Sequence, residues 1–186
     1  MSDLVFYGVG VGLVLTIVYL VTTWNGFVRA RNKVDESWSG IDVQLKRRHD
    51  LVPNLVKTVK GYADHERGTL TEVTEARTRA MSAGTRGERA SAEGALTTAL
   101  GNVNALAEQS PQLRAADSFQ QLQAELSGLE SEIQAARRIY NANVQSYNSR
   151  IQVFPNSLLA SSSFEPREFF ELDSPSERAV PAVSFA

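Results

Sequence analysis

Residues 4–28 read LVFYGVGVGLVLTIVYLVTTWNGFV, a run of 25 positions without a charged side chain. As an α-helix that rises 1.5 Å per residue, the run is about 37 Å long, which is enough to cross a hydrocarbon core of about 30 Å. The residues before it include no Lys or Arg, and no small-residue cleavage site follows it, so it is not typical of a cleaved signal peptide. The sequence therefore predicts a permanent transmembrane anchor over residues 1–28.

The charges beside this run predict its orientation. Asp3 precedes it, and Arg29, Arg31 and Lys33 follow it directly. Because positive charge is retained on the cytoplasmic side of a membrane, we expect a single-pass protein. Its short amino end is expected outside and the rest of the chain in the cytoplasm.

Two glycines give the predicted span a face for helix association. Gly8 and Gly12 lie four residues apart, which lets two helices approach closely in lipid, where packing must drive association. Glycine is also common in membrane helices without any such role. The pair indicates a homo-oligomer, and the span itself implies membrane lipid as a partner.

Helical periodicity continues from the anchor into the rest of the chain. The first stripe extends the membrane helix at heptad spacing, through Phe27, Arg31, Val34, Trp38, Ile41, Leu45 and Arg48. Asp50 before Pro53 is typical of a helix start, because Asp caps a helix and proline is tolerated in its first turn. We therefore expect a kink or a join between two helices at residues 50–53.

Three further stripes follow. The second is expected to run from residue 52 to a break at residues 84–87 (GTRG). The third ends at Ser110-Pro111 and has small or apolar residues on one face: Ala92, Leu96, Ala99, Val103 and Leu106. The fourth, which Asp117 can cap, is the most regular, with one stutter: Phe119, Leu122, Leu126, Leu129, Ile133, Ala136, Tyr140, Val144, Tyr147, Ile151 and Phe154.

These patterns predict an all-α fold. An amino-terminal transmembrane helix continues into an antiparallel, four-helix-type bundle with long first and fourth helices. No alternating strand pattern occurs between residues 29 and 154. The predicted domains are the anchor at 1–28, the bundle at 29–154 and an irregular tail at 155–186.

Composition excludes most enzyme classes. The 186 residues carry a net charge of −2, no cysteine and two histidines. A chain of this charge is not typical of a nucleic-acid binder, and the absence of cysteine removes thiolate metal sites and cysteine nucleophiles. No phosphate-binding loop, nucleophile elbow or metal-binding HExxH motif occurs. We therefore predict no enzyme activity, no catalytic residues, no cofactor and no metal site.

A polar segment and an apolar tail are the candidate interaction surfaces. Lys46, Arg47 and Arg48 point in three directions on a helix, so they do not form one anion site, but they suit pairing with acidic residues of a neighbouring helix or subunit. His49 beside them is interpreted as solvated surface. Phe164, Phe169 and Phe170 lie in a segment without a helical face, where they either pack back onto the bundle or dock on a partner.

Several segments resemble a known family. They are residues 31–34, 38–39 and 41–63, followed in order by Glu75-Ala76-Arg77, residues 119–126, Tyr140-Asn141, Tyr147-Asn148, Phe154-Pro155 and Phe169-Phe170. Together they resemble the LemA family of bacterial membrane proteins from about residue 24 to residue 171. Members usually have a Tyr-Asn pair just after the membrane span, where this sequence has Trp24-Asn25.

The resemblance implies an amino-terminal anchor and a helical bundle, without known catalytic residues or a cofactor. The family includes relatives linked to the shaping of bacterial organelle membranes. We therefore expect a non-enzymatic scaffold or interaction protein that self-assembles at the bacterial cytoplasmic membrane. The alternative is an adaptor or regulatory subunit of a membrane-associated enzyme such as a protease or phosphatase. The sequence does not identify the protein partner.

Overall fold

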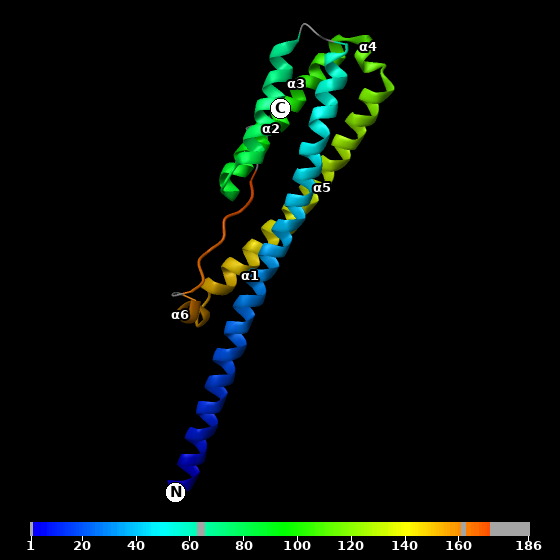
Figure 1. The fold of residues 1–186 in the computed structure, drawn as a ribbon. Helices are drawn as coiled ribbons and strands as arrows, with labels where there is room; N and C mark the ends of the chain where they lie inside the picture. The colour runs from blue at the N-terminus through cyan, green and yellow to red at the C-terminus, as the bar shows by residue number, and fades with distance from the viewer. Residues whose placement is uncertain (1, 63–65, 161–162, 172–186) are drawn as a thin grey trace, which may run out of the picture. The chain divides into compact units, whose positions relative to one another are not determined.

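The computed structural model describes residues 2–62, 66–160 and 163–171 (Figure 1). Within these residues every regular element is a helix, which confirms the predicted all-α fold. The helices are α1 (Ser2–Lys60), α2 (Arg67–Ser82), α3 (Arg86–Gln109), α4 (Pro111–Arg114), α5 (Asp117–Gln152) and α6 (Asn156–Ala160). As predicted, α1 and α5 are the longest. The predicted tail beyond residue 171 lies outside the described residues.

Contacts within the chain define two compact units, and α1 and α5 contribute to both. The first unit comprises Met1–Ile41 and Ala136–Phe169, so it contains the amino-terminal part of α1, the end of α5, α6 and an extended segment. Its larger buried apolar side chains come from both long helices and from the segment: Phe27, Val34, Ile41, Tyr140, Val144, Tyr147, Ile151 and Phe164. The division of the chain at residues 28 and 154 stays a prediction.

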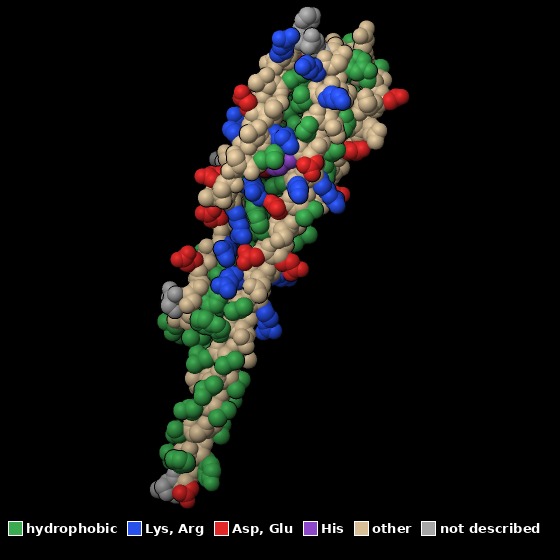
Figure 2. Space-filling view, viewed as in Figure 1, with side chains coloured by type: hydrophobic (Ala, Val, Ile, Leu, Met, Phe, Trp, Pro, Cys, Tyr) green, Lys and Arg blue, Asp and Glu red, His purple; other side chains and the backbone are tan. Residues whose placement is uncertain are grey.

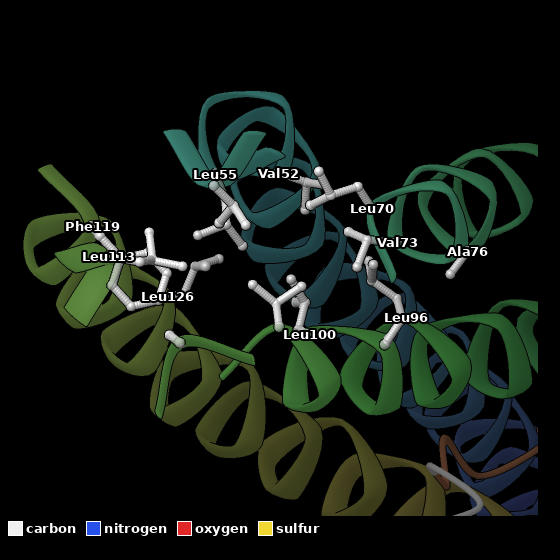
Figure 3. Packing of buried hydrophobic residues seen from close by; sticks show 14 of the residues in the cluster. Val52, Leu55, Leu70, Val73, Ala76, Leu96, Leu100, Leu113, Phe119 and Leu126 are labelled. Atoms are coloured by element: carbon white, nitrogen blue, oxygen red, sulfur yellow. The ribbon is translucent and has the colours of Figure 1, made fainter. Parts of the chain in front are cut away.

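The second unit comprises Asp42–Ala135 and Phe170–Ala186. In it the end of α1, then α2, α3 and the start of α5 run alternately in opposite directions, so this unit is an antiparallel four-helix bundle (Figure 1). Side chains from these helices and from α4 meet in one core (Figure 3), whose larger members are Val52, Leu55, Val59, Leu70, Val73, Leu96, Leu100, Val103, Leu113, Phe119 and Leu126.

Of the two alternatives predicted at residues 50–53, a kink or a join, the join is wrong, because α1 passes through Pro53 and ends at Lys60. The buried stripe passes this point in register through Leu45, Val52 and Leu55. The break between the first two helices lies instead after Lys60, where the amide groups of Gly61 and Tyr62 each donate to a carbonyl three residues earlier. Such tightened bonds are typical of a last helical turn.

A hydrogen bond from α2 explains why α1 continues through Pro53. Proline has no N–H, so the carbonyl oxygen four residues earlier, that of His49, loses its partner within the helix. In this structure that oxygen accepts from Nε of Arg77 at 2.7 Å. The apolar stripe on both sides of Pro53 is buried, so the packing outweighs the start signal that Asp50 and Pro53 give in the sequence.

The predicted break at residues 84–87 is confirmed, and a capping box defines it. The hydroxyl of Thr85 accepts from the amide of Glu88 at 3.1 Å, and the Glu88 carboxylate accepts from the amides of Gly84 and Thr85 at 3.0 Å each. The two backbone bonds and the Thr85 hydroxyl lower the pKa of Glu88 below its ordinary value of 4.5, because they stabilise the ionised carboxylate.

The last two predicted boundaries agree with the structure to within a few residues. Helix α3 ends just before Ser110, and α5 begins at Asp117. Helix α5 ends at Gln152, and its buried positions keep the predicted period and stutter. The tail is less irregular than predicted, since α6 occupies Asn156–Ala160, while residues 164–171 form no helix.

We predict that the capping box contributes measurably to stability. Thr85→Ala removes the acceptor for the Glu88 amide and should lower the free energy of unfolding by about 1 kcal/mol. Urea unfolding in mild detergent, followed by circular dichroism at pH 7, measures this. Thr98→Ala is the matched control in the same helix, because its hydroxyl bonds only the carbonyl of Gly94. An equal loss in both variants would contradict the capping role.

The same box predicts a pH dependence. The pKa of Glu88 is lower in the folded chain than its ordinary value of 4.5. The ionised carboxylate therefore stabilises the fold above pH 4.5, and this stabilisation is lost as the pH falls through the lowered pKa of the folded chain. The stability difference between the wild type and Glu88→Gln should therefore shrink as the pH falls below 4.5.

Candidate functional site

The structure divides the polar segment of α1 into exposed and buried residues. Lys46 and Arg47 are exposed, as an interaction surface requires. Arg48 and His49 are buried, with 4% and 8% of their surfaces exposed. The interpretation of His49 as solvated surface is therefore wrong, and Arg48 is not available on the surface of a single copy. Both side chains lie on the buried side of the second unit.

Arg48 joins three helices. One of its terminal nitrogens, NH2, donates to Oε2 of Glu130 on α5 at 2.5 Å and to the hydroxyl of Thr97 on α3 at 3.0 Å. The other, NH1, faces Oε2 of Glu93 at 3.6 Å. The expected pairing of this segment with acidic residues of a neighbouring helix is thus observed. Arg47 likewise approaches Glu132 at 3.8 Å on the surface.

Glu93 is fully buried in α3 and is held by α1. Its Oε1 lies 2.6 Å from Nε2 of His49, and its Oε2 faces Arg48. An unpaired carboxylate in such a place would be very unfavourable, so the two α1 side chains compensate for its burial. We call the buried Arg48, His49 and Glu93, together with the half-buried Thr97 and Glu130, the buried polar cluster.

The cluster is suited to structure rather than to chemistry on a substrate. Its ion pairs connect α1, α3 and α5, and the Arg77 bond to His49 adds α2. Its central side chains, Arg48 and Glu93, are buried, so a substrate has no access to them. Among the residues that the structure describes, no group of three His, Cys, Asp or Glu side chains is arranged to hold a metal ion.

Glu93 was not predicted as a site residue, although the third stripe contains a signal for it. The predicted face was Ala92, Leu96, Ala99, Val103 and Leu106. The observed buried face also includes Leu100 and Ala107. Extending the spacing of Leu96, Leu100, Val103 and Ala107 backwards by three residues reaches Glu93. A carboxylate in register with an apolar face predicts a buried partner elsewhere.

The tail phenylalanines have different environments. Phe164 is 6% exposed, and its ring contacts those of Trp24 and Phe27 at centroid distances of 5.0 and 5.1 Å. Phe170 is fully buried, whereas Phe169 is 40% exposed. Packing onto the helices therefore accounts for Phe164 and Phe170, and Phe169 alone of the three stays on the surface of a single copy.

Polar side chains of α5 hold the extended segment that follows Phe164. Tyr147 donates to the carbonyl of Glu165 at 3.0 Å, and Tyr140 to that of Glu168 at 2.8 Å. Asn148 bonds both the amide and the carbonyl of Arg167, at 2.8 and 2.9 Å. Burial raises the pKa of Tyr147, which keeps its hydroxyl a donor. Three side chains from the two Tyr-Asn pairs of the family resemblance, those of Tyr140, Tyr147 and Asn148, thus make all four of these bonds.

The glycine pair of the predicted span lies on an open helix face. A Cβ atom added at Gly8 or Gly12 would meet no other heavy atom within 4 Å, and the same holds at Gly10. The apolar side chains around them are exposed, from Val5 (65%) to Val21 (54%). This face is available for contact with lipid or with another helix.

Open grooves on the second unit differ in charge. One groove between α1 and α2, of about 480 Å³, continues into another of about 420 Å³. Their cationic lining residues are Lys57, Lys60, Arg67 and Arg77, and the apolar ones are Val52, Pro53, Val56 and Leu70, with Glu75 as the carboxylate. A groove of about 430 Å³ between α1 and α5 is more acidic, because the carboxylates of Asp50, Glu125 and Glu132 line it with one cation, Arg47.

Known proteins are similar to this chain over most of its length. The sequence matches the LemA family over residues 37–185. Magnetosome protein MamQ of Magnetospirillum gryphiswaldense is 27% identical over 188 residues, covering 84% of this chain and 69% of that protein. Magnetosome protein MamQ 1 of Paramagnetospirillum magneticum is 26% identical, covering 85% and 70%. Protein LemA of Metamycoplasma hominis is 28% identical over 137 residues, covering 73% and 63%.

We predict that Glu93 and Arg48 are energetically coupled. Glu93→Leu leaves buried positive charge without its carboxylate and should lower the free energy of unfolding by about 3 kcal/mol. The double variant Arg48→Met/Glu93→Leu should cost less than the sum of the single variants, because it removes both charges. Urea unfolding of the four proteins measures the coupling.

Glu132→Gln is the control for this cycle. Its pair with Arg47 is more than half exposed on both sides and should change stability by less than about 0.5 kcal/mol. Additive effects of the Arg48 and Glu93 replacements would contradict the predicted coupling.

Proposed function

This chain belongs to the LemA family, and from that premise we propose that it is a non-enzymatic scaffold at the bacterial cytoplasmic membrane. In this proposal the start of α1 spans the membrane, the helical units project into the cytoplasm, and copies of the chain assemble with one another. The observation that carries it is the exposed apolar run of α1. The most apolar window of 18 residues in this helix has a mean hydropathy of 2.2, and none of it is buried.

Exposure of that run supports lipid contact. The core helix of a soluble protein would bury an apolar window, whereas here every described side chain from residue 5 to residue 21 is exposed. An apolar surface of this extent is unfavourable in water, and a bilayer removes that cost. Two relatives are named magnetosome proteins, and neither name indicates an enzyme.

Two exposed features support self-assembly. Within the span, the open face at Gly8 and Gly12 permits close approach of a second helix. On the helical units, Lys46, Arg47 and Phe169 are exposed and remain proposed contact residues, whereas Arg48, Phe164 and Phe170 are committed to the interior of one copy. Head-to-tail contacts between copies would build a ring or a larger array on the membrane.

The cationic groove between α1 and α2 supports the alternative function, an adaptor for a membrane-associated enzyme. Four cations, one carboxylate and four apolar residues line these two adjoining grooves. That composition suits an acidic, amphipathic segment of a different protein. Purification in mild detergent separates the two functions, because a scaffold yields a particle of this chain alone and an adaptor yields a particle with a second protein.

We predict that the span contributes to the assembly of copies. Gly8→Ile/Gly12→Ile fills the open face and should reduce the mass of the particle in mild detergent and in lipid nanodiscs, because the helices can no longer approach closely. Light scattering coupled to size exclusion measures this mass. Val9→Ile/Val11→Ile is the matched control, since it enlarges neighbouring side chains without changing the glycines.

A wild-type chain that is monomeric in both detergent and nanodiscs would contradict the scaffold. Lys46→Glu/Arg47→Glu tests the contact between helical units separately. If this variant has a smaller particle mass, and the wild type reaches the same mass at high salt, the contact at these two residues is electrostatic.

We predict that the amino end lies outside the cell. The chain contains no cysteine, so a single cysteine at Ser2 or at Arg114 reports its own position. A membrane-impermeant maleimide added to intact spheroplasts should label Ser2→Cys and not Arg114→Cys, because the three cations after the span are retained inside. Labelling of Arg114→Cys alone would reverse the orientation.

A further inference from the structure

Protein covers the last part of the apolar run. Phe27 is fully buried beneath Phe164, and the carbonyl oxygen of Gly26 accepts from Arg150 on α5 at 3.1 Å. The run is exposed from residue 5 to residue 25, with Thr23 half-buried, and this part is about 31 Å long as a helix, close to a hydrocarbon core of about 30 Å. Protein therefore begins to cover the run at Gly26, two residues before its end.

The turn after α5 lies beside the apolar run. Tyr19 donates to Oδ1 of Asn156 at 3.2 Å, and Nδ2 of Asn156 donates to the carbonyl of Arg150 at 3.1 Å. Both residues belong to the first unit, and Figure 1 shows α6 next to α1 in that unit. Asn156 thus fixes α6 at the level of Tyr19, well inside the run of 25 uncharged residues.

This turn exposes large apolar side chains. Val153, Phe154 and Leu158 are 57%, 76% and 71% exposed. Figure 2 shows hydrophobic side chains continuing from the exposed run of α1 to the neighbouring part of the first unit. No carboxylate occurs from residue 150 to residue 160, and Arg150 provides a cation at the start of this stretch. Apolar residues beside a cation, without acidic residues, suit the headgroup boundary of a bilayer.

We propose that Val153, Phe154 and Leu158 insert into the interfacial layer of the membrane that α1 spans, so that the first unit contacts lipid at a second place. The occupant of this surface is the phospholipid bilayer, because the surface is continuous with the exposed run and Tyr19 bonds the turn directly. The insertion adds apolar surface at the level of Tyr19, near the end of the exposed run. This inference rests on the membrane anchoring proposed above.

Depth-dependent quenching tests the insertion in the full chain. Because the chain has no cysteine, single cysteines at Leu13, Phe154 and Tyr62 can each carry an environment-sensitive fluorophore, with the protein in phosphatidylcholine nanodiscs. Lipid that carries a nitroxide near the headgroup end of its acyl chain is the quencher. We expect Phe154→Cys to be quenched at least about half as strongly as Leu13→Cys, and Tyr62→Cys, which is 49% exposed in the second unit, to be quenched little.

The outcomes separate the two proposals. Quenching at Leu13 without quenching at Phe154 overturns the insertion and leaves the anchor in place. A second copy of the chain that covers the turn would give this result. Absence of quenching at both positions overturns both proposals. Equal quenching at Tyr62 and Phe154 also overturns the insertion, because the label itself would then be entering the lipid.

A matched pair of variants tests the side chains. Phe154→Glu/Leu158→Glu should reduce quenching of a label at Val153→Cys at least about threefold, because carboxylates disfavour insertion, and should leave quenching at Leu13→Cys unchanged. Ile139→Glu changes another exposed apolar residue of the first unit, 60% exposed, and should leave both signals unchanged. Equal quenching with and without the two glutamates would overturn the insertion.

Discussion

A buried carboxylate constrains the bundle of the second unit. Glu93 on α3 is fully buried, and its carboxylate oxygens lie 2.6 Å from His49 and 3.6 Å from Arg48. Without these partners its desolvation would be very unfavourable, so α1 and α3 must pack in the register that brings the three side chains together. Apolar contacts alone would tolerate a slip of one helical turn, because heptad stripes of Leu, Val and Ala repeat along both helices. The ion pairs distinguish between registers that the apolar residues leave nearly equivalent.

The same segment of α1 explains how a proline is accommodated in a long helix. Pro53 leaves the carbonyl of His49 without its helical partner, and Arg77 of α2 supplies one at 2.7 Å. His49 therefore contributes its ring to Glu93 on α3 and its backbone to α2. Arg48 extends the connection to Glu130 on α5. Two consecutive residues thus tie α1 to each of the other three long helical segments in this unit.

The spacing of apolar residues and the signals for helix starts were sufficient to predict the long helices. They were not sufficient to predict which side chain each polar residue contacts. The stripes of α1 and α5, the break at the capping box and the end of α3 follow from spacing, glycine and proline. The join at Pro53 was predicted wrongly because the helix continues there with the help of a hydrogen bond from Arg77, which is 24 residues away in the sequence. Arg48 was placed on the surface for a similar reason. Its position in the stripe was recognised, but its acidic partners lie on α3 and α5, and the sequence does not reveal which helix faces which.

Hydropathy alone does not show which part of the uncharged run is exposed and which part is covered by protein, because apolar side chains are favourable both in lipid and in a protein core. Val21 and Phe27 belong to one uncharged run, yet Val21 is exposed and Phe27 is covered by Phe164 from the tail. The difference arises from residues more than 100 positions later, which fold back onto α1. The helix thus passes from an exposed apolar surface into a protein core without a change in composition. The residues that cover the helix, and not the run itself, therefore determine where the exposed part ends. In this chain the covering residues include Arg150, Asn156 and Phe164, so under the proposed anchoring the carboxyl-terminal part of the chain would set the depth of the amino-terminal anchor.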